Sequence, residues 1–438
     1  MSAVFLIAVA GTALAAPDEE EPAPPSSPAS GDLAAAPPAD KASGIAVQSP
    51  ETTHPVMNGV LLVPRTLALI LLAGPRFAAG QLDEYLEKKS PDAFGRTVKH
   101  QPGWRTGVVA DWETSLGPSV GLRLGRGFGH GIAVDARGGF FGARGQSGGL
   151  RAQFGELTDL NLEPSVTFDA GRKLARVYAG IDGQGPRTHY LERRLEAQGT
   201  LGSRIGPMRI MATAGVSRVA TSDEDADDDP VAGSYDATMI TGFEETQRAA
   251  TGELAVAYDD RRRSHRFVHA GAWSTGWLLR AAGAWTRGDG SRTGMFSTGR
   301  GSLEARRLFD LFHGDRVLSI GARAEMITAD AEEVPFEQLP ALGGSERMRA
   351  FARDELRGRS TTYADAQYEW ALGADTRAFV FVEGGGVASK PTALETDDLH
   401  FGYGGGLRLL NGMATSVRAH VAASDDGDVG FFVQLGAL

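Results

Sequence analysis

Residues 316–326, Arg-Val-Leu-Ser-Ile-Gly-Ala-Arg-Ala-Glu-Met, decide the fold class of this chain. The apolar residues at every second position are Leu318, Ile320, Ala322, Ala324 and Met326. The residues between them are Ser319, Gly321, Arg323 and Glu325. Because successive side chains of a β-strand point to opposite faces, the stretch predicts a strand with one apolar face and one charged face.

The same division recurs from about residue 104 to the C-terminus, for example over residues 131–137 and 416–423. The segments are roughly ten residues long and are separated by Gly, Asp and Asn, as in transmembrane barrels. A soluble antiparallel sandwich shows the same alternation. Charges on the polar face, the absence of a helical period over this region and an export signal favour a membrane barrel. The predicted fold class is therefore an all-β transmembrane antiparallel β-barrel.

We count about sixteen strands, an even number as in single-chain bacterial barrels. Residues 266–287 leave the count open, because they fit one long strand or two short ones. The loop over about residues 328–360 joins strands eleven and twelve on the outer side if both termini are periplasmic, and it is long enough to fold into the lumen. The five strands expected after it are residues 361–372, 376–387, 400–410, 413–424 and 429–438.

The part ahead of the barrel divides into three segments. Residues 1–15 carry an apolar run followed by Ala-Leu-Ala, which predicts a signal peptide. Residues 16–55 are rich in Pro, Ala, Ser and acid, which predicts a disordered linker. Residues 56–103 predict an amphipathic pre-barrel segment, with a second start at Met57 as the alternative. The barrel is expected to occupy residues 104–438.

Composition excludes several classes of protein. Glycine is about 13% (58 of 438 residues), nearly twice the usual share. No cysteine is present, so disulfides and thiolate sites are excluded. The net charge of −11 argues against a nucleic-acid partner. No apolar run is long enough for a membrane-spanning helix.

No catalytic residue, metal site or cofactor is predicted, and we expect no enzyme activity. Residues 145–149 match a nucleophile-elbow pattern around Ser147, but a hairpin loop between strands fits the glycine-rich context better. The acidic run at 223–229 lacks the ligand spacing of a calcium loop. His265 and His269 lie in a strand pattern, where they form no compact ligand set.

Three motifs carry a family resemblance. Residues 339–344, Leu-Pro-Ala-Leu-Gly-Gly, precede Met-Arg-Ala-Phe at 348–351. Downstream lie Ala-Gln-Tyr-Glu-Trp at 366–370 and Phe-Val-Glu-Gly-Gly at 381–385. In order and spacing, they resemble the lid-loop and two strand motifs of the BamA/TamA/FhaC superfamily, the D15-type surface-antigen barrels.

The resemblance implies a lid-loop lock in which Arg349 reaches into the barrel and pairs with Glu383. A buried guanidinium needs such a carboxylate. The residues implied in the lock are Arg349, Phe351, Gly343, Gly344, Phe381, Glu383 and Gly385. Departures from the family pattern are Ala350 for glycine, Glu383 for aspartate, Gln367 for an acid and Leu438 for a terminal phenylalanine. Ala350 disfavours a positive φ, and Gln367 removes a charge partner.

The function implied by the resemblance is assembly of outer-membrane proteins or translocation of proteins across the bacterial outer membrane. The expected partners are outer-membrane lipid or lipopolysaccharide, unfolded client proteins and a separate periplasmic subunit. Family members carry POTRA modules before the barrel, and no complete module fits ahead of residue 104, so we expect a reduced member. A passive porin or channel and a surface-exposed binding protein are the alternatives.

Overall fold

The computed structural model describes thirteen stretches of the chain: residues 103–113, 117–129, 132–142, 145–154, 162–181, 183, 185–223, 229–263, 273–373, 376–390, 394, 398–411 and 414–435. The predicted signal peptide and linker lie outside them, as does the pre-barrel segment apart from its last residue. In the described stretches, no helix has the length and apolar character to cross a bilayer.

One antiparallel sheet dominates these stretches and contains seventeen strands, of which sixteen remain when the two-residue β9 (Arg262–Arg263) is set aside. The long strands before the lid loop are β1 Gly103–Glu113, β2 Gly117–Gly129, β3 Ile132–Phe140, β4 Gly145–Gln153, β5 Leu162–Tyr178, β6 Thr188–Ile205, β7 Met208–Ser222, β8 Thr246–Asp259, β10 Trp273–Gly290, β11 Gly294–Asp310 and β12 Arg316–Ile327. Those after it are β15 Ser360–Ala371, β16 Thr376–Ala388, β17 Leu399–Asn411, β18 Ala414–Ser424 and β19 Val429–Leu435. Each pairs with the next long strand in the sequence.

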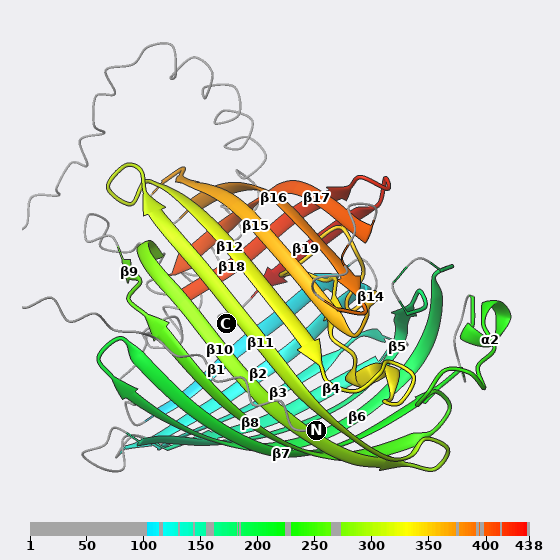
Figure 1. Cartoon of the computed structure of the whole chain (residues 1–438). Coiled ribbons are helices and arrows are strands. Elements are labelled where there is room, and N and C mark those ends of the chain that lie inside the picture. Colours follow the sequence, from blue (N-terminus) through cyan, green and yellow to red (C-terminus); the bar gives the residue numbers. More distant parts are fainter. Residues whose placement is uncertain are drawn as a thin grey trace, which may run out of the picture. The chain divides into compact units, whose positions relative to one another are not determined.

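Pairing between β1 and β19 closes the sheet into a barrel (Figure 1). Closure removes the sheet edges, whose unpaired backbone groups a lipid environment cannot satisfy.

The predicted all-β barrel is confirmed, and the five strands expected after the loop lie within a few residues of their observed bounds. The open question at 266–287 resolves to one long strand, β10, over its described part. The predicted hairpin loop at residues 145–149 is wrong, because these residues begin β4 and pair with β3 and β5.

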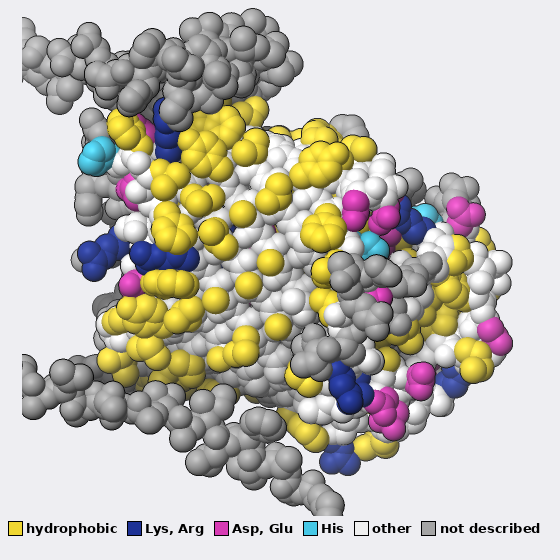
Figure 2. Space-filling view, turned by 45° about the horizontal axis from the view of Figure 1, so that its top comes forward, with side chains coloured by type: hydrophobic (Ala, Val, Ile, Leu, Met, Phe, Trp, Pro, Cys, Tyr) yellow, Lys and Arg dark blue, Asp and Glu magenta, His cyan; other side chains and the backbone are white. Residues whose placement is uncertain are grey.

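The barrel wall has the two faces that the alternation predicted. On β12, Ile320 and Met326 are 48% and 42% exposed, whereas Glu325 between them is 8% exposed. Figure 2 shows apolar side chains spread over the outside of the wall and charged ones towards its ends. The inward face carries ion pairs, such as Arg306 of β11 with Asp365 of β15 at 2.8 Å. This ion pair reaches across β12, which lies between β11 and β15, and the carboxylate offsets the cost of burying the Arg306 charge.

The loops at one end of the barrel pack together. The lid, residues 328–359, begins where the arrow of β12 ends (Figure 1) and contains η2 (Phe336–Gln338) and a ribbon of β13 (Ala341–Leu342) with β14 (Leu356–Arg357). Its first part packs against the loop that holds α2 (Val231–Ser234). The buried residues of this cluster include Tyr178, Tyr190, Val231, Ile240, Phe243, Val334, Phe336 and Leu339. We call this end of the barrel the lid end.

Candidate functional site

The lid makes a tight turn at the motif that the sequence singled out. Gly343 and Gly344 have φ of +116° and +107°, a region that favours glycine. A Cβ on Gly343 would lie 2.0 Å from the carbonyl oxygen of Ala352, so no other residue fits there. The Gly344 amide donates to the Phe351 carbonyl at 3.1 Å and closes the turn. Residues 345–350 are thereby presented as a compact tip.

The tip places Arg349 against the barrel wall. Its Nε lies 3.6 Å from Glu383 Oε2 of β16, and its guanidinium carbon lies 3.8 Å from the centre of the Phe381 ring. Its Nη1 donates to Gln367 Oε1 of β15 at 3.2 Å. Only 4% of the Arg349 side chain is exposed. The guanidinium therefore has a carboxylate, an aromatic face and an amide oxygen as its surroundings, and we call Arg349, Phe381 and Glu383 the lid lock.

The Glu383 carboxylate is satisfied from two directions. The backbone amide of Arg349 donates to its Oε1, and the Tyr363 hydroxyl donates to its Oε2 at 3.0 Å. A Cβ on Gly402 of β17 would lie 3.2 Å from the Glu383 Cγ. Gly402 thus leaves room for the extra methylene by which glutamate differs from the aspartate of the family motif.

Phe351 and Gly385 fit the tip to the wall. Phe351 is buried, and its ring meets the His400 ring edge-on at 5.3 Å between centres. A Cβ on Gly385 would lie 3.1 Å from Leu342 Cδ1 and 3.2 Å from Met348 Sδ. The glycine therefore allows the lid to lie close to β16.

The structure accommodates two of the departures from the family motif, Ala350 and Gln367. The residue with positive φ in the tip is Met348, at +48°, and Ala350 is not among the non-glycine residues in that region. Alanine is therefore compatible with the backbone at position 350. Gln367 removes a charge but still accepts a hydrogen bond from Arg349, so its amide oxygen retains a polar contact there. Leu438 lies outside the described stretches.

Sequence reasoning missed a second attachment of the lid, on β5 and β6. Arg176 of β5 donates through Nη2 to Asp354 Oδ2 at 2.6 Å, and its Nε lies 3.4 Å from Glu192 of β6. Glu337 of the lid accepts from the Tyr190 hydroxyl and lies 3.7 Å from Arg357. The sequence did contain a signal for this attachment, because residues 353–357 carry several charges in a loop expected to fold inward. Their partners on β5 and β6 lie far away in the sequence, so the signal did not identify them.

The two attachments lie on opposite walls. Among the sixteen long strands, β5 is the fifth and β16 the thirteenth, so eight strand positions separate them, half of the closed sheet. Arg349 contacts β16 and Asp354, five residues later, contacts β5. The docked lid thus bridges the lumen.

The lid also touches the closing strand of the barrel. A Cβ on Gly430 of β19 would lie 2.2 Å from the Arg349 carbonyl oxygen, so the lid backbone rests directly on this strand. Arg187, between β5 and β6, bonds to Glu355 of the lid and donates through Nη1 to Asp428, just before β19, at 2.7 Å. The position of the lid is therefore linked to the start of β19.

Replacing Asp354 by asparagine is expected to loosen the lid at its β5 attachment. Burial alone would raise the pKa of Asp354, but Arg176 and Arg357 more than offset it and lower the pKa below the usual 3.8. The ion pair therefore persists at neutral pH and is lost as the pH falls through this lowered pKa. Because 37% of the Asp354 side chain is exposed, we expect an effect of about 1 kcal/mol.

The measurement is the frequency of lid openings in single-channel recordings. Asp354→Asn should open more often than wild type at neutral pH, and the difference should vanish once Asp354 is protonated in the wild type. Glu346→Gln, which alters an exposed lid carboxylate, is the matched control and should behave as wild type. Equal opening of wild type and Asp354→Asn at neutral pH would contradict the role of the second attachment.

Few other groups in the described stretches offer chemistry. His400, Asp425 and Asp426 place three potential ligand atoms within 4.8 Å of one another at the lid end, on partly or fully exposed side chains. Ser147 lies within β4, without the strand-turn-helix setting of a nucleophile elbow. Asp223 accepts hydrogen bonds from the amides of Val231 and Ala232 at the start of α2. His265 and His269 lie outside the described residues.

Comparisons with known proteins place the fold. No protein-family model matches the sequence, and no curated protein matches it. A structure of BamA from Haemophilus ducreyi lacking POTRA domains 1–3 is similar with a TM-score of 0.55 at 13% identity, over 77% of this chain and 70% of that one.

Two structures of CdiB are looser matches. CdiB from Acinetobacter baumannii has a TM-score of 0.46 at 13% identity, over 75% of this chain and 59% of that one. CdiB from Escherichia coli has a TM-score of 0.49 at 15% identity, over 76% of this chain and 63% of that one. The comparison of folds therefore rests on BamA. This chain has the barrel fold of BamA, as the resemblance of its three motifs predicted.

Proposed function

We propose that this protein inserts other β-barrel proteins into the bacterial outer membrane or moves proteins across it. The activity involves no chemical reaction: β1 and β19 part, and their free backbone groups pair with an incoming strand. The lid end then faces the outside of the cell. The barrel fold shared with BamA and a lid that bridges the lumen support this function.

The observation that carries the proposal is the short seam between β1 and β19. Among the described residues, four pairs join these strands, from Ala110 with Leu435 to Glu113 with Phe432. Over the described residues, eleven pairs join β1 to β2 and seven join β18 to β19. Since each backbone hydrogen bond contributes a similar net stability, of about 0.5–1.5 kcal/mol, the described part of the seam requires less free energy to part than the described part of either other contact.

The docked lid supports the seam from inside. Gly430 lies in the part of β19 that precedes its residues paired with β1, and the Arg349 carbonyl rests on it. The guanidinium of Arg187 binds both Glu355 of the lid and Asp428, just before β19. Withdrawal of the lid would therefore remove contacts from β19 beside the seam. A client polypeptide is the partner that this arrangement implies, and the separate periplasmic subunit remains a prediction.

A reconstituted assay tests the function. Proteoliposomes that contain the folded protein should accelerate the insertion of an unfolded outer-membrane barrel protein relative to empty liposomes. The lumen should show low conductance while the lid is docked, and Arg349→Ala should raise it. No acceleration, together with a wide steady conductance that Arg349→Ala leaves unchanged, would overturn the proposal in favour of a passive channel.

A further inference from the structure

The outward face of the wall carries exposed arginines close to the lid end. They are Arg193 of β6, Arg218 of β7, Arg248 of β8 and Arg287 of β10. On its own strand, each arginine shares the outward face with exposed apolar residues. Leu195, Val216, Leu254 and Trp285 are 44%, 60%, 58% and 59% exposed. We call these four arginines the outer arginine patch.

The strand pairing brings the members of the patch together. Arg218 lies directly opposite Arg248 on the neighbouring strand, and Arg248 lies directly opposite Asp289 of β10. Directly opposed side chains have Cβ atoms about 4.5–5.5 Å apart, and like charges at that separation destabilise a sheet. None of the four arginines forms an ion pair with a residue that the structure describes. The patch therefore holds four positive charges, and Asp289 is the acid that lies directly opposite one of them.

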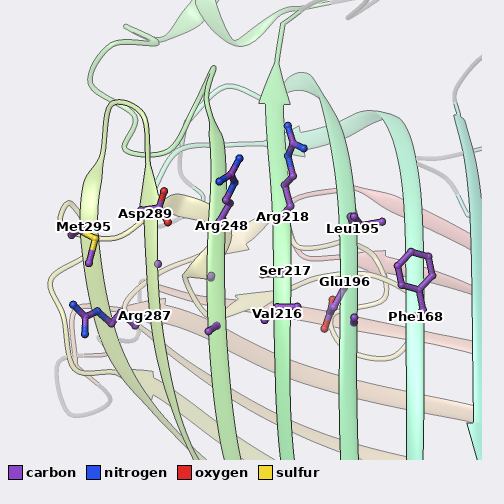
Figure 3. Close-up of a pocket in the computed structure, with 14 residues that line it drawn as sticks. Phe168, Leu195, Glu196, Val216, Ser217, Arg218, Arg248, Arg287, Asp289 and Met295 are labelled. Atoms are coloured by element: carbon purple, nitrogen blue, oxygen red, sulfur yellow. The ribbon is translucent and has the colours of Figure 1, made fainter.

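A shallow groove of ≈ 490 Å³ runs across the patch. Its apolar lining includes Phe168, Leu195, Val216 and Met295, and its charged lining is Arg218, Arg248, Arg287, Glu196 and Asp289. Figure 3 shows Arg218 and Arg248 extending in the same direction, towards the end of β7, with Val216 further down the wall. Arg218 and Arg248 thus lie on the lid side of Val216, whereas Arg287 lies level with Val216 in the strand register.

The position of Arg218 and Arg248 above Val216 matches the order of groups in a membrane lipid, with its headgroup above its acyl chains. An outward arginine costs about 2–4 kcal/mol at the bilayer midplane but only about 0–1 kcal/mol near the interface, which places the patch at headgroup depth. The guanidinium fork fits phosphate oxygens, and each basic side chain near an anionic leaflet adds about 1 kcal/mol of attraction. Three strand spacings of about 4.8 Å give the patch a width of about 14 Å, wider than a single phosphate.

We propose that the outer arginine patch binds a membrane lipid with two phosphates on its headgroup, whose acyl chains lie along the apolar part of the groove. The lipid is a component of the leaflet at the lid end. Binding rests on the proposed membrane placement of the barrel but not on the lid lock or on client insertion. It would fix the depth of β6 to β10, while the seam lies elsewhere in the sheet.

The test uses lipid A, a bisphosphorylated glycolipid, as the probe and the folded full chain in detergent micelles. Retention of lipid A is measured by native mass spectrometry for wild type and for the combined Arg218→Ser, Arg248→Ser and Arg287→Ser variant. We expect the combined variant to bind at least about tenfold more weakly, since three charge-assisted contacts are lost. Unchanged retention would overturn the proposal.

Arg307→Ser is the matched control. Arg307 also lies on the outward side, beside Trp277 at 5.1 Å, but near the end of β11 remote from the lid. This variant should retain lipid A within about twofold of wild type. An equal loss of retention in Arg307→Ser would mean that any outward charge suffices, which would contradict a specific patch.

Two further measurements separate the remaining explanations. If the combined variant does not fold, judged by heat-modifiable migration, the single Arg248→Gln substitution replaces it and should still weaken retention several-fold. Displacement of lipid A by inorganic phosphate at equal concentration would show that the patch binds soluble anions and not a lipid. Because no client is present, failure here leaves the insertion assay unaffected, and failure of that assay leaves lipid binding intact.

Discussion

A disulfide between β1 and β19 is expected to stop client insertion while the barrel remains folded. The change is Asp111→Cys with Gln434→Cys, at positions directly opposite each other across the seam. Directly opposed residues of antiparallel strands have Cα atoms about 4.5 or 5.5 Å apart, within the range that a disulfide spans. The natural sequence has no cysteine, so the two introduced thiols have no competing partner within the chain.

The measurement is the rate of client insertion by proteoliposomes under oxidising and reducing conditions. Oxidation should abolish insertion, and reduction should restore it. Ala305→Cys with Ala322→Cys, which joins β11 to β12 by the same kind of pair, is the control and should insert clients at the wild-type rate in both conditions. If the oxidised seam variant still inserts clients, the strands do not need to part and the proposed mechanism is wrong.

Breaking the lid lock should have the largest effect on stability. Arg349→Ala removes the contacts with Glu383, Phe381 and Gln367 and leaves a buried carboxylate without its cation. Loss of one partner of a buried pair costs about 3–5 kcal/mol. Glu383→Gln keeps an oxygen for the Arg349 amide and should cost less, about 1–2 kcal/mol. The combined variant should cost less than the sum by about 0.5–3 kcal/mol, because the two residues interact.

Two measurements distinguish a contact that holds the lid in place from one that only stabilises the barrel wall. Heat-modifiable migration reports the stability of the barrel, and trypsin cleavage after Arg347 or Arg353 reports release of the lid. The matched control is Arg306→Ala, which breaks an ion pair with both partners on the wall. It should lower barrel stability without exposing the lid to trypsin. Additive costs for Arg349→Ala and Glu383→Gln, with an uncleaved lid, would show that the pair does not hold the loop.

The wall of the barrel was predictable from sequence because its period of two is a local property. Residues 316–326 show the two faces of β12 without knowledge of any neighbour. Residues 145–149 were assigned to a loop because glycine-rich segments have weak alternation, and pairing with β3 and β5 determines that they form a strand. Local composition therefore fails where the neighbouring strands supply the stability.

The lid lock was placed by motif resemblance, whereas the attachment to β5 and β6 was not found. Arg176 and Glu192 have the pattern of ordinary lumen-facing charges, and only closure of the barrel shows that Arg176 meets Asp354. The outer arginine patch was missed for a related reason. Alternation assigns charge to the lumen by default, and Arg218 and Arg248 depart from it near the strand ends, where lipid gives way to headgroups.

The bridge formed by the lid has a consequence for how the chain acquires its structure. Arg176 and Asp354 are 178 residues apart in the sequence, and Arg187 and Asp428 are 241 apart. Such distant contacts bring a large loss of chain entropy before they contribute stability, so they form slowly. The tip also rests on Gly430, which reaches its place only with the last hairpin. Docking of the lid is therefore a late event in the biogenesis of the barrel and marks its completion.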